Sequence, residues 1–99
     1  MPYHIEYTLE ALTHLADLSA RDSNIVLDNV SVQLKHQPTV ATRNRKPLRA
    51  NDIAPWELRI RDLRVYYDVV EAPERVVTIR AIGVKNRNRV FISGQEVKP

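Results

Sequence analysis

The chain has 99 residues, 43% hydrophobic and 27% charged, which is ordinary for a globular protein and predicts a single domain over residues 1–99. It has no cysteine, no apolar run of about 18 residues and no signal-peptide pattern, which excludes disulfides, thiolate metal sites and a membrane-spanning helix and favours the cytoplasm. The net charge of +3 divides unevenly: residues 1–40 have two basic and five acidic residues, whereas residues 41–99 have thirteen basic and seven acidic ones. The basic second part suits either a nucleic-acid or acidic partner, or simply a solvated surface.

The first 38 residues predict a short strand and two helices. Residues 3–7 alternate as a strand does. Thr8 is a suitable cap for a helix whose apolar residues have helical spacing: Leu9, Leu12, Leu15, Ala16 and Leu18. After a break at residues 19–22, Asp22 or Ser23 caps a second helix that ends before Pro38. The short link predicts an antiparallel helical hairpin.

Residues 39–55 predict a polar, basic loop with a short strand near Leu48, ended by Pro55. The clearest pattern follows, because apolar and polar residues alternate over 56–60 and again over 63–69. The phase slips between the two runs, which predicts a two-residue hairpin turn at Arg61 and Asp62. A further strand is expected over 76–84 and a short one over 90–92. The fold class is therefore α+β, with the helical hairpin packed on one face of a mainly antiparallel sheet.

The predicted hairpin places Glu57, Arg59, Arg64 and Tyr66 on the polar face of the sheet, and the next strand is expected to bring Arg80 beside Tyr66. Like charges directly opposite on a sheet are destabilising, so Arg59 opposite Arg64 is informative. A phosphate between them would reverse that sign, because guanidinium groups bind phosphate bidentately. This face is either a shallow anion platform or a solvated polar surface.

Other candidate chemistry is weak. The three histidines lie in the first part of the chain and lack metal-ligand spacing, and residues 41–99 contain none. There is no phosphate-cradling glycine loop and no paired-carboxylate motif. Neither a metal nor another cofactor is therefore expected. The basic run 84–89 is a second candidate for phosphate contacts, or else a solvated loop.

Several segments resemble the RelE/ParE toxin superfamily of bacterial type II toxin–antitoxin systems. They are residues 12–18, Lys46-Pro47-Leu48, the hairpin WELRIRDLRVYYDV at 56–69, and Ile82-Gly83-Val84-Lys85. The similarity spans nearly the whole chain in order and spacing, and the hairpin is its most specific part. It implies a helical hairpin on a curved antiparallel sheet. It also implies one of two activities, metal-independent mRNA cleavage on the ribosome or inhibition of DNA gyrase.

The resemblance assigns site residues position by position. The basic residues of the family's hairpin correspond to Arg59 and Arg64, and the one after the following strand to Lys85. Glu57 stands where RelE has a further lysine, and Phe91 where related nucleases often have a tyrosine. The implied catalytic set is Arg59, Arg64, Lys85 and Glu57. The implied RNA-binding set is Lys46, Arg61, Tyr66, Arg80 and Arg87.

The implied reaction is attack of an RNA 2′-hydroxyl on the adjacent phosphate. It needs a base, cations for the extra negative charge and an acid for the leaving oxygen. Glu57 is the candidate base or, alternatively, a neutralising partner of the arginines. The implied partners are a cognate antitoxin and either the ribosome with its mRNA or DNA gyrase.

Overall fold

The computed structural model describes all of residues 1–99 and has the expected α+β architecture. The chain begins with strand β1 (His4–Tyr7) and two helices, α1 (Leu9–Asp17) and α2 (Ala20–Leu34). Six strands follow: β2 (Arg45–Pro47), β3 (Trp56–Ile60), β4 (Leu63–Val70), β5 (Val76–Asn86), β6 (Arg89–Ile92) and β7 (Gln95–Val97). Neither helix is long and apolar enough to cross a membrane.

Both helices start at hydroxyl caps. The Thr8 side chain accepts a hydrogen bond from the Ala11 amide at 3.1 Å, which confirms the predicted cap. The second cap was predicted wrongly, at Asp22 or Ser23. Instead Ser19 accepts from the Asp22 amide at 3.1 Å, so α2 begins at Ala20 and only Leu18 and Ser19 separate the helices. Each cap satisfies an amide that the first helical turn leaves without a partner.

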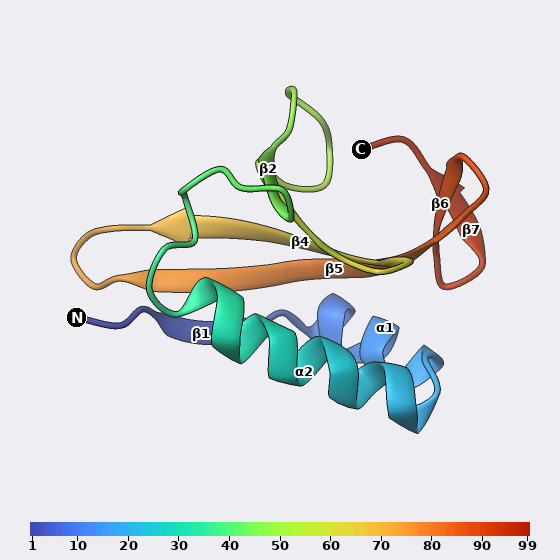
Figure 1. Cartoon of the computed structure of the whole chain (residues 1–99), viewed down its shortest axis with the longest axis horizontal. Coiled ribbons are helices and arrows are strands. Elements are labelled where there is room, and N and C mark those ends of the chain that lie inside the picture. The colour runs from blue at the N-terminus through green and yellow to red at the C-terminus, as the bar shows by residue number, and fades with distance from the viewer.

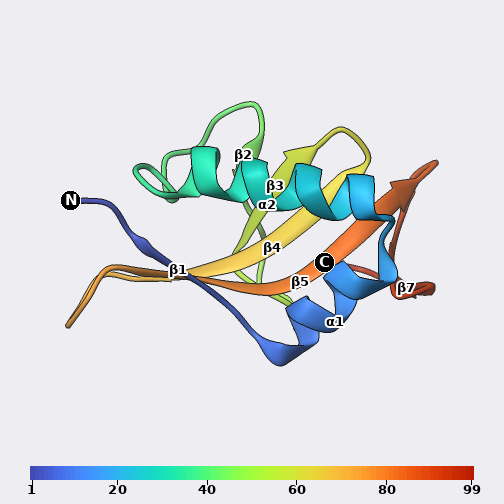
Figure 2. The same ribbon diagram turned by 90° about the horizontal axis from the view of Figure 1, so that it is seen from below.

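The strands form one mainly antiparallel sheet in the order β2-β3-β4-β5-β6-β7, and β1 joins β5 in parallel. Figures 1 and 2 show α1 and α2 running in opposite directions across the same face of this twisted sheet. The short strand expected near Leu48 is β2, which ends one residue earlier. The strand expected over 76–84 extends two residues further, to Asn86, and β7 was not predicted.

The β3–β4 hairpin has the predicted register. Ile60 lies opposite Leu63, Arg59 opposite Arg64, and Glu57 opposite Tyr66. The register between β4 and β5 was predicted wrongly, because β5 shifts by one residue between Tyr66 and Tyr67. Ala81 therefore lies opposite Tyr66, and the extra residue at this irregularity is Arg80.

The face of the sheet beneath the helices forms the main core. Its fully buried members include Leu58, Val65 and Tyr67 from the central strands and Val26 and Val30 from α2. The Trp56 ring stacks against Tyr67 with centroids 6.2 Å apart and packs against this core. Successive side chains along a strand point to opposite faces of the sheet. Arg59 and Arg64, which lie opposite each other in the hairpin, are therefore on the face away from the helices.

The other face was expected to be open, and this is wrong. Loop 48–55 and the β6–β7 hairpin cover part of it, and a second small core forms there around Ala54, Tyr66 and Ala81. Leu48, Ile53, Val90 and Ile92 pack against that core. The polar face is therefore partly covered rather than a flat platform, and Tyr66 has no exposed ring on which a base could stack.

Candidate functional site

A cleft of about 390 Å³ lies on the face of the sheet opposite the helices, between β3–β4 and the C-terminal hairpin. It is lined by Glu57, Arg59, Arg64 and Lys85, the four residues that the resemblance assigns to catalysis. Its remaining lining residues are Leu48, Asn88, Arg89, Val90, Glu96, Val97, Lys98 and Pro99. The fold thus brings side chains from β3, β4 and β5 to one concave surface.

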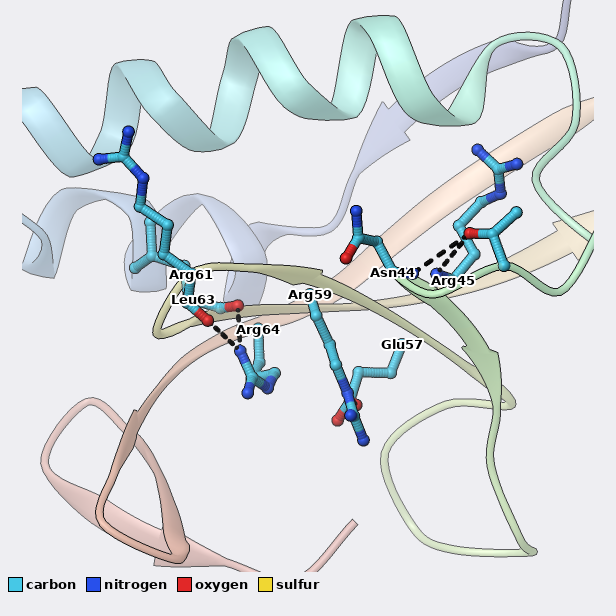
Figure 3. A network of polar contacts seen from close by, with 8 residues as sticks. Asn44, Arg45, Glu57, Arg59, Arg61, Leu63 and Arg64 are labelled. Carbon is cyan, nitrogen blue, oxygen red and sulfur yellow. Dashed lines mark hydrogen bonds and ion pairs between the residues drawn. The ribbon is translucent and has the colours of Figure 1, made fainter.

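Glu57 and Arg59 form an ion pair at the floor of the cleft. The Arg59 Nε atom donates to Glu57 Oε1 at 2.7 Å. The Glu57 side chain is only 5% exposed, whereas that of Arg59 is 44% exposed. The carboxylate is therefore held in place while much of the guanidinium faces solvent. Figure 3 shows both side chains extending from β3 to the same side of the sheet.

Arg64 is held more tightly than its partner across the hairpin. Its Nη1 atom donates to the carbonyl oxygens of Arg61 at 2.7 Å and Leu63 at 2.9 Å (Figure 3). The residue is 7% exposed and has no carboxylate partner. Arg64 is thus a fixed positive charge, bound only to backbone and directed at the cleft.

The charge balance of the cleft favours an anionic ligand. Its two carboxylates are each paired, Glu57 with Arg59 and Glu96 with Arg89 at 3.8 Å. Arg64, Lys85 and Lys98 line the same space without a carboxylate. Unpaired cations in a concave site attract phosphate groups, and guanidinium groups bind them with two parallel hydrogen bonds.

Tyr66 lies beneath this surface and not in its lining. Its ring is fully buried, and its hydroxyl is a buried side-chain polar atom without a hydrogen-bond partner. Burial raises the pKa of Tyr66 far above its ordinary value, and the negative charge of Glu57 raises it further. The hydroxyl therefore keeps its proton throughout the physiological range.

The other residues assigned to RNA binding lie outside the cleft lining. Lys46 is opposite Glu57 on the neighbouring strand β2. The Arg61 side chain extends toward the helices, away from Arg64 (Figure 3). Arg80 forms a 3.9 Å ion pair with Asp68 at a separate depression beside loop 48–55. Arg87 occupies the exposed β5–β6 turn with a φ of 60°.

Sequence reasoning did not single out two basic residues of the cleft, Arg89 and Lys98. Arg89 fell within the basic run 84–89, and its membership of that run was the available signal. No signal in the sequence pointed to Lys98, because β7 was not predicted. Arg45 was placed in the basic loop, yet it is 8% exposed and structural. Its guanidinium donates to the Val40 carbonyl and to the carbonyl and side chain of Gln33, each at 3.0 Å.

His14, far from the cleft, is also structural. Its Nδ1 atom accepts a hydrogen bond from the Ile82 amide at 3.2 Å and so joins α1 to β5. Burial lowers the pKa of His14, against the opposing charges of Asp17 and Glu10. No three His, Cys, Asp or Glu side chains gather closely enough to hold a metal ion.

No family model and no curated protein matches the sequence. Among solved structures, the chain is similar to one in the crystal structure of the toxin–antitoxin complex RelBE2 from Mycobacterium tuberculosis. The two are 24% identical with a TM-score of 0.73, over 86% of this chain and 100% of that one. Identity at this level shows the fold. The chain therefore shares its fold with that chain of the RelBE2 complex.

Proposed function

We propose that this protein is the toxin of a type II toxin–antitoxin system and that it cleaves mRNA on the ribosome. The observation that carries the proposal is the cleft, in which Arg59, Arg64 and Lys85 surround the ordered carboxylate of Glu57. The similarity to a chain of a toxin–antitoxin complex supports the toxin part. The chemistry of the cleft supports the substrate class, because several basic groups around a buried carboxylate suit RNA phosphodiester cleavage.

In this reaction Glu57 takes the proton of the 2′-hydroxyl. The oxygen then attacks the adjacent phosphorus while Arg59 and Arg64 bind the non-bridging oxygens. Lys85 is the candidate donor of a proton to the departing 5′-oxygen, because an ammonium group can release a proton and a guanidinium cannot. Positioning and charge neutralisation supply most of the acceleration in such a site.

A specific observation keeps gyrase inhibition as the second candidate. The cleft lining contains neither histidine nor tyrosine, the side chains that most readily complete acid–base catalysis. Phe91 lines a different depression, next to Ile82 and His14. A ParE-type toxin binds its target without cleaving RNA and needs no proton-transfer residues.

Two assays with purified protein separate these functions. The first follows mRNA cleavage in a reconstituted translation reaction by primer extension, using Glu57→Gln and the control Glu74→Gln, at an exposed position in the β4–β5 loop. The second measures DNA supercoiling by gyrase. Cleavage that Glu57→Gln abolishes and Glu74→Gln preserves is the expected result. Intact mRNA together with inhibited supercoiling would establish the alternative.

The proposal also includes a cognate antitoxin. An acidic antitoxin segment that enters the cleft would place carboxylates where RNA phosphates bind, since both are recognised by guanidinium groups. Induced expression of the chain alone should arrest growth, and co-expression with the product of an adjacent gene should restore it. Normal growth without such a partner would show that the chain is not an active toxin.

A further inference from the structure

The hydroxyl of Tyr66 lacks the hydrogen bond that a buried polar group normally has. The residue is fully buried, and no group meets hydrogen-bond geometry at its hydroxyl, although the Glu57 carboxylate lies close enough to raise the pKa of the hydroxyl as an acceptor does. Buried polar atoms without a partner are rare in folded proteins, and each calls for an explanation. A phenylalanine would pack against Ala54 and Ala81 equally well. The hydroxyl therefore adds nothing to packing, and a role in the neighbouring site is the explanation to test.

The nearest chemistry belongs to Glu57. Tyr66 and Glu57 lie directly opposite each other across β3 and β4, where side chains on one face are neighbours. The charge of Glu57 acts on the Tyr66 hydroxyl, as do the opposite charges of Arg64 and Arg59. The hydroxyl carries a proton that it can donate, and the carboxylate has lone pairs beyond the one that Arg59 uses.

The Glu57 carboxylate forms one ion pair, with Arg59, and the proposed substrate would compete for that arginine. The Glu57 side chain is almost completely buried, whereas the Arg59 guanidinium is half exposed. If that guanidinium turns to a phosphate, the carboxylate is left buried and unpaired. An unpaired buried carboxylate takes up a proton, because burial disfavours its charged form. A protonated Glu57 cannot act as a base.

We propose that Tyr66 is a positioning residue whose hydroxyl donates to Glu57 when Arg59 leaves that carboxylate for a substrate phosphate. This inference rests on the proposed function in one respect, because binding of an RNA phosphate is the event that moves Arg59. The other charged groups near the carboxylate are worse placed. Lys46 lies opposite Glu57 on β2 but outside the cleft, and Arg64 Nη1 is occupied by two carbonyl oxygens. Lys85, Arg89, Glu96 and Lys98 also line the cleft, and none of them forms an ion pair with Glu57.

The first experiment needs no RNA, because Arg59→Ala imitates the departure of Arg59. The pKa of Glu57 is measured by carbon-detected NMR of its side-chain carboxyl group. Tyr66→Phe should raise this pKa by about one unit, or tenfold in proton affinity, in the Arg59→Ala background. In the protein that retains Arg59, Tyr66→Phe should have a much smaller effect on the Glu57 pKa. Tyr67→Phe is the matched control, since the Tyr67 hydroxyl donates to the Pro38 carbonyl on the helix-covered face.

Equal shifts in both backgrounds, or no shift in either, would overturn the proposal. A shift produced by Lys46→Met in place of Tyr66→Phe would assign the donor role to Lys46 and overturn it as well. Tyr66→Phe removes an atom that makes no hydrogen bond, so the variant should fold normally, and urea unfolding checks this.

The second experiment adds a trinucleotide with a deoxyribose at the scissile position, which binds without being cleaved. The Glu57 pKa should then rise in Tyr66→Phe even with Arg59 present, and an unchanged pKa would count against the proposal. In cleavage assays of the same variant, the acidic limb of the pH profile should move to higher pH with little change in KM. Intact mRNA on programmed ribosomes would refute the proposed function, whereas the Arg59→Ala comparison would still decide the role of Tyr66.

Discussion

Glu57 and Arg59 are two residues apart on one strand, and their ion pair joins a buried carboxylate to a half-exposed guanidinium over 2.7 Å. The pair is asymmetric, because a ligand in the cleft can reach the arginine more easily than the glutamate. The partners therefore contribute differently to the site. Arg59 is free to exchange its carboxylate for a phosphate, and Glu57 stays at the floor of the cleft.

Glu57→Gln should remove cleavage while preserving the fold. Glutamine has nearly the same shape but cannot accept a proton from a 2′-hydroxyl, so we expect a loss of about 10²–10⁴-fold in rate. The Arg59 partner is half exposed and can be solvated, which limits the cost to stability. Single-turnover cleavage on programmed ribosomes measures the rate. Full activity in Glu57→Gln would exclude the carboxylate as the base.

Arg64→Ala should weaken both function and stability. The side chain is buried and donates to the carbonyls of Arg61 and Leu63, so we expect a loss of about 1–2 kcal/mol in the free energy of unfolding. Arg43→Ala, at an exposed position in the loop before β2, should cost less than about 1 kcal/mol. Urea denaturation of the two variants makes the comparison. Equal stabilities would show that the backbone contacts of Arg64 contribute nothing.

Arg45→Ala should destabilise the protein without altering the chemistry of the cleft. The substitution removes three hydrogen bonds at 3.0 Å and leaves the carbonyl groups of Val40 and Gln33 without this donor. We expect a cost of about 2–4 kcal/mol, which is large for an arginine. Calorimetry gives the cost. Cleavage at a temperature where the variant is still folded should match that of the unsubstituted protein, and a selective loss of cleavage would place Arg45 in the site.

Stability should fall as the pH drops below about 6.5, the ordinary pKa of histidine. Burial lowers the pKa of His14 in the folded state, so the unfolded chain binds more protons in this range and unfolding becomes easier. A protonated imidazole also cannot accept the hydrogen bond from the Ile82 amide. Thermal melts between pH 7.5 and 5.5 should show a smaller decrease in His14→Gln than in the exposed control His36→Gln. Parallel curves for the two variants would contradict this assignment.

The β3–β4 hairpin could be predicted from the sequence down to its register, because period-two alternation and a phase slip are local signals. The same pattern placed Glu57, Arg59 and Arg64 on one face correctly. The burial of that face could not be predicted, since it depends on loop 48–55 and β7, whose positions are set by distant contacts. The shift at Arg80 does mark the apolar pattern, because the residues that face the main core change from Val77 and Ile79 to Ile82. The mark is faint, since Ala81 makes the run apolar on both phases.

The last prediction concerns Gly83, where β5 passes closest to β6. A Cβ atom there would lie 3.0 Å from the Phe91 carbonyl oxygen and 3.0 Å from Val90 Cγ1. The backbone oxygen cannot move without shifting β6, so Gly83→Ala should cost about 1–3 kcal/mol. Gly94→Ala is a useful comparison, because a Cβ there meets nothing, although its φ of 79° strains an alanine.

The two glycine variants should differ in activity as well as in stability. Gly83 is opposite Arg64 on β5, and β6 carries two lining residues of the cleft, Arg89 and Val90. Displacing β6 should therefore move the wall of the cleft and weaken binding of a short RNA, measured by fluorescence anisotropy. Gly94→Ala acts at the distant β6–β7 turn and should leave that affinity nearly unchanged. Equal RNA affinity in both variants, with Gly83→Ala folded but less stable, would show that the β6 wall is not part of the binding surface.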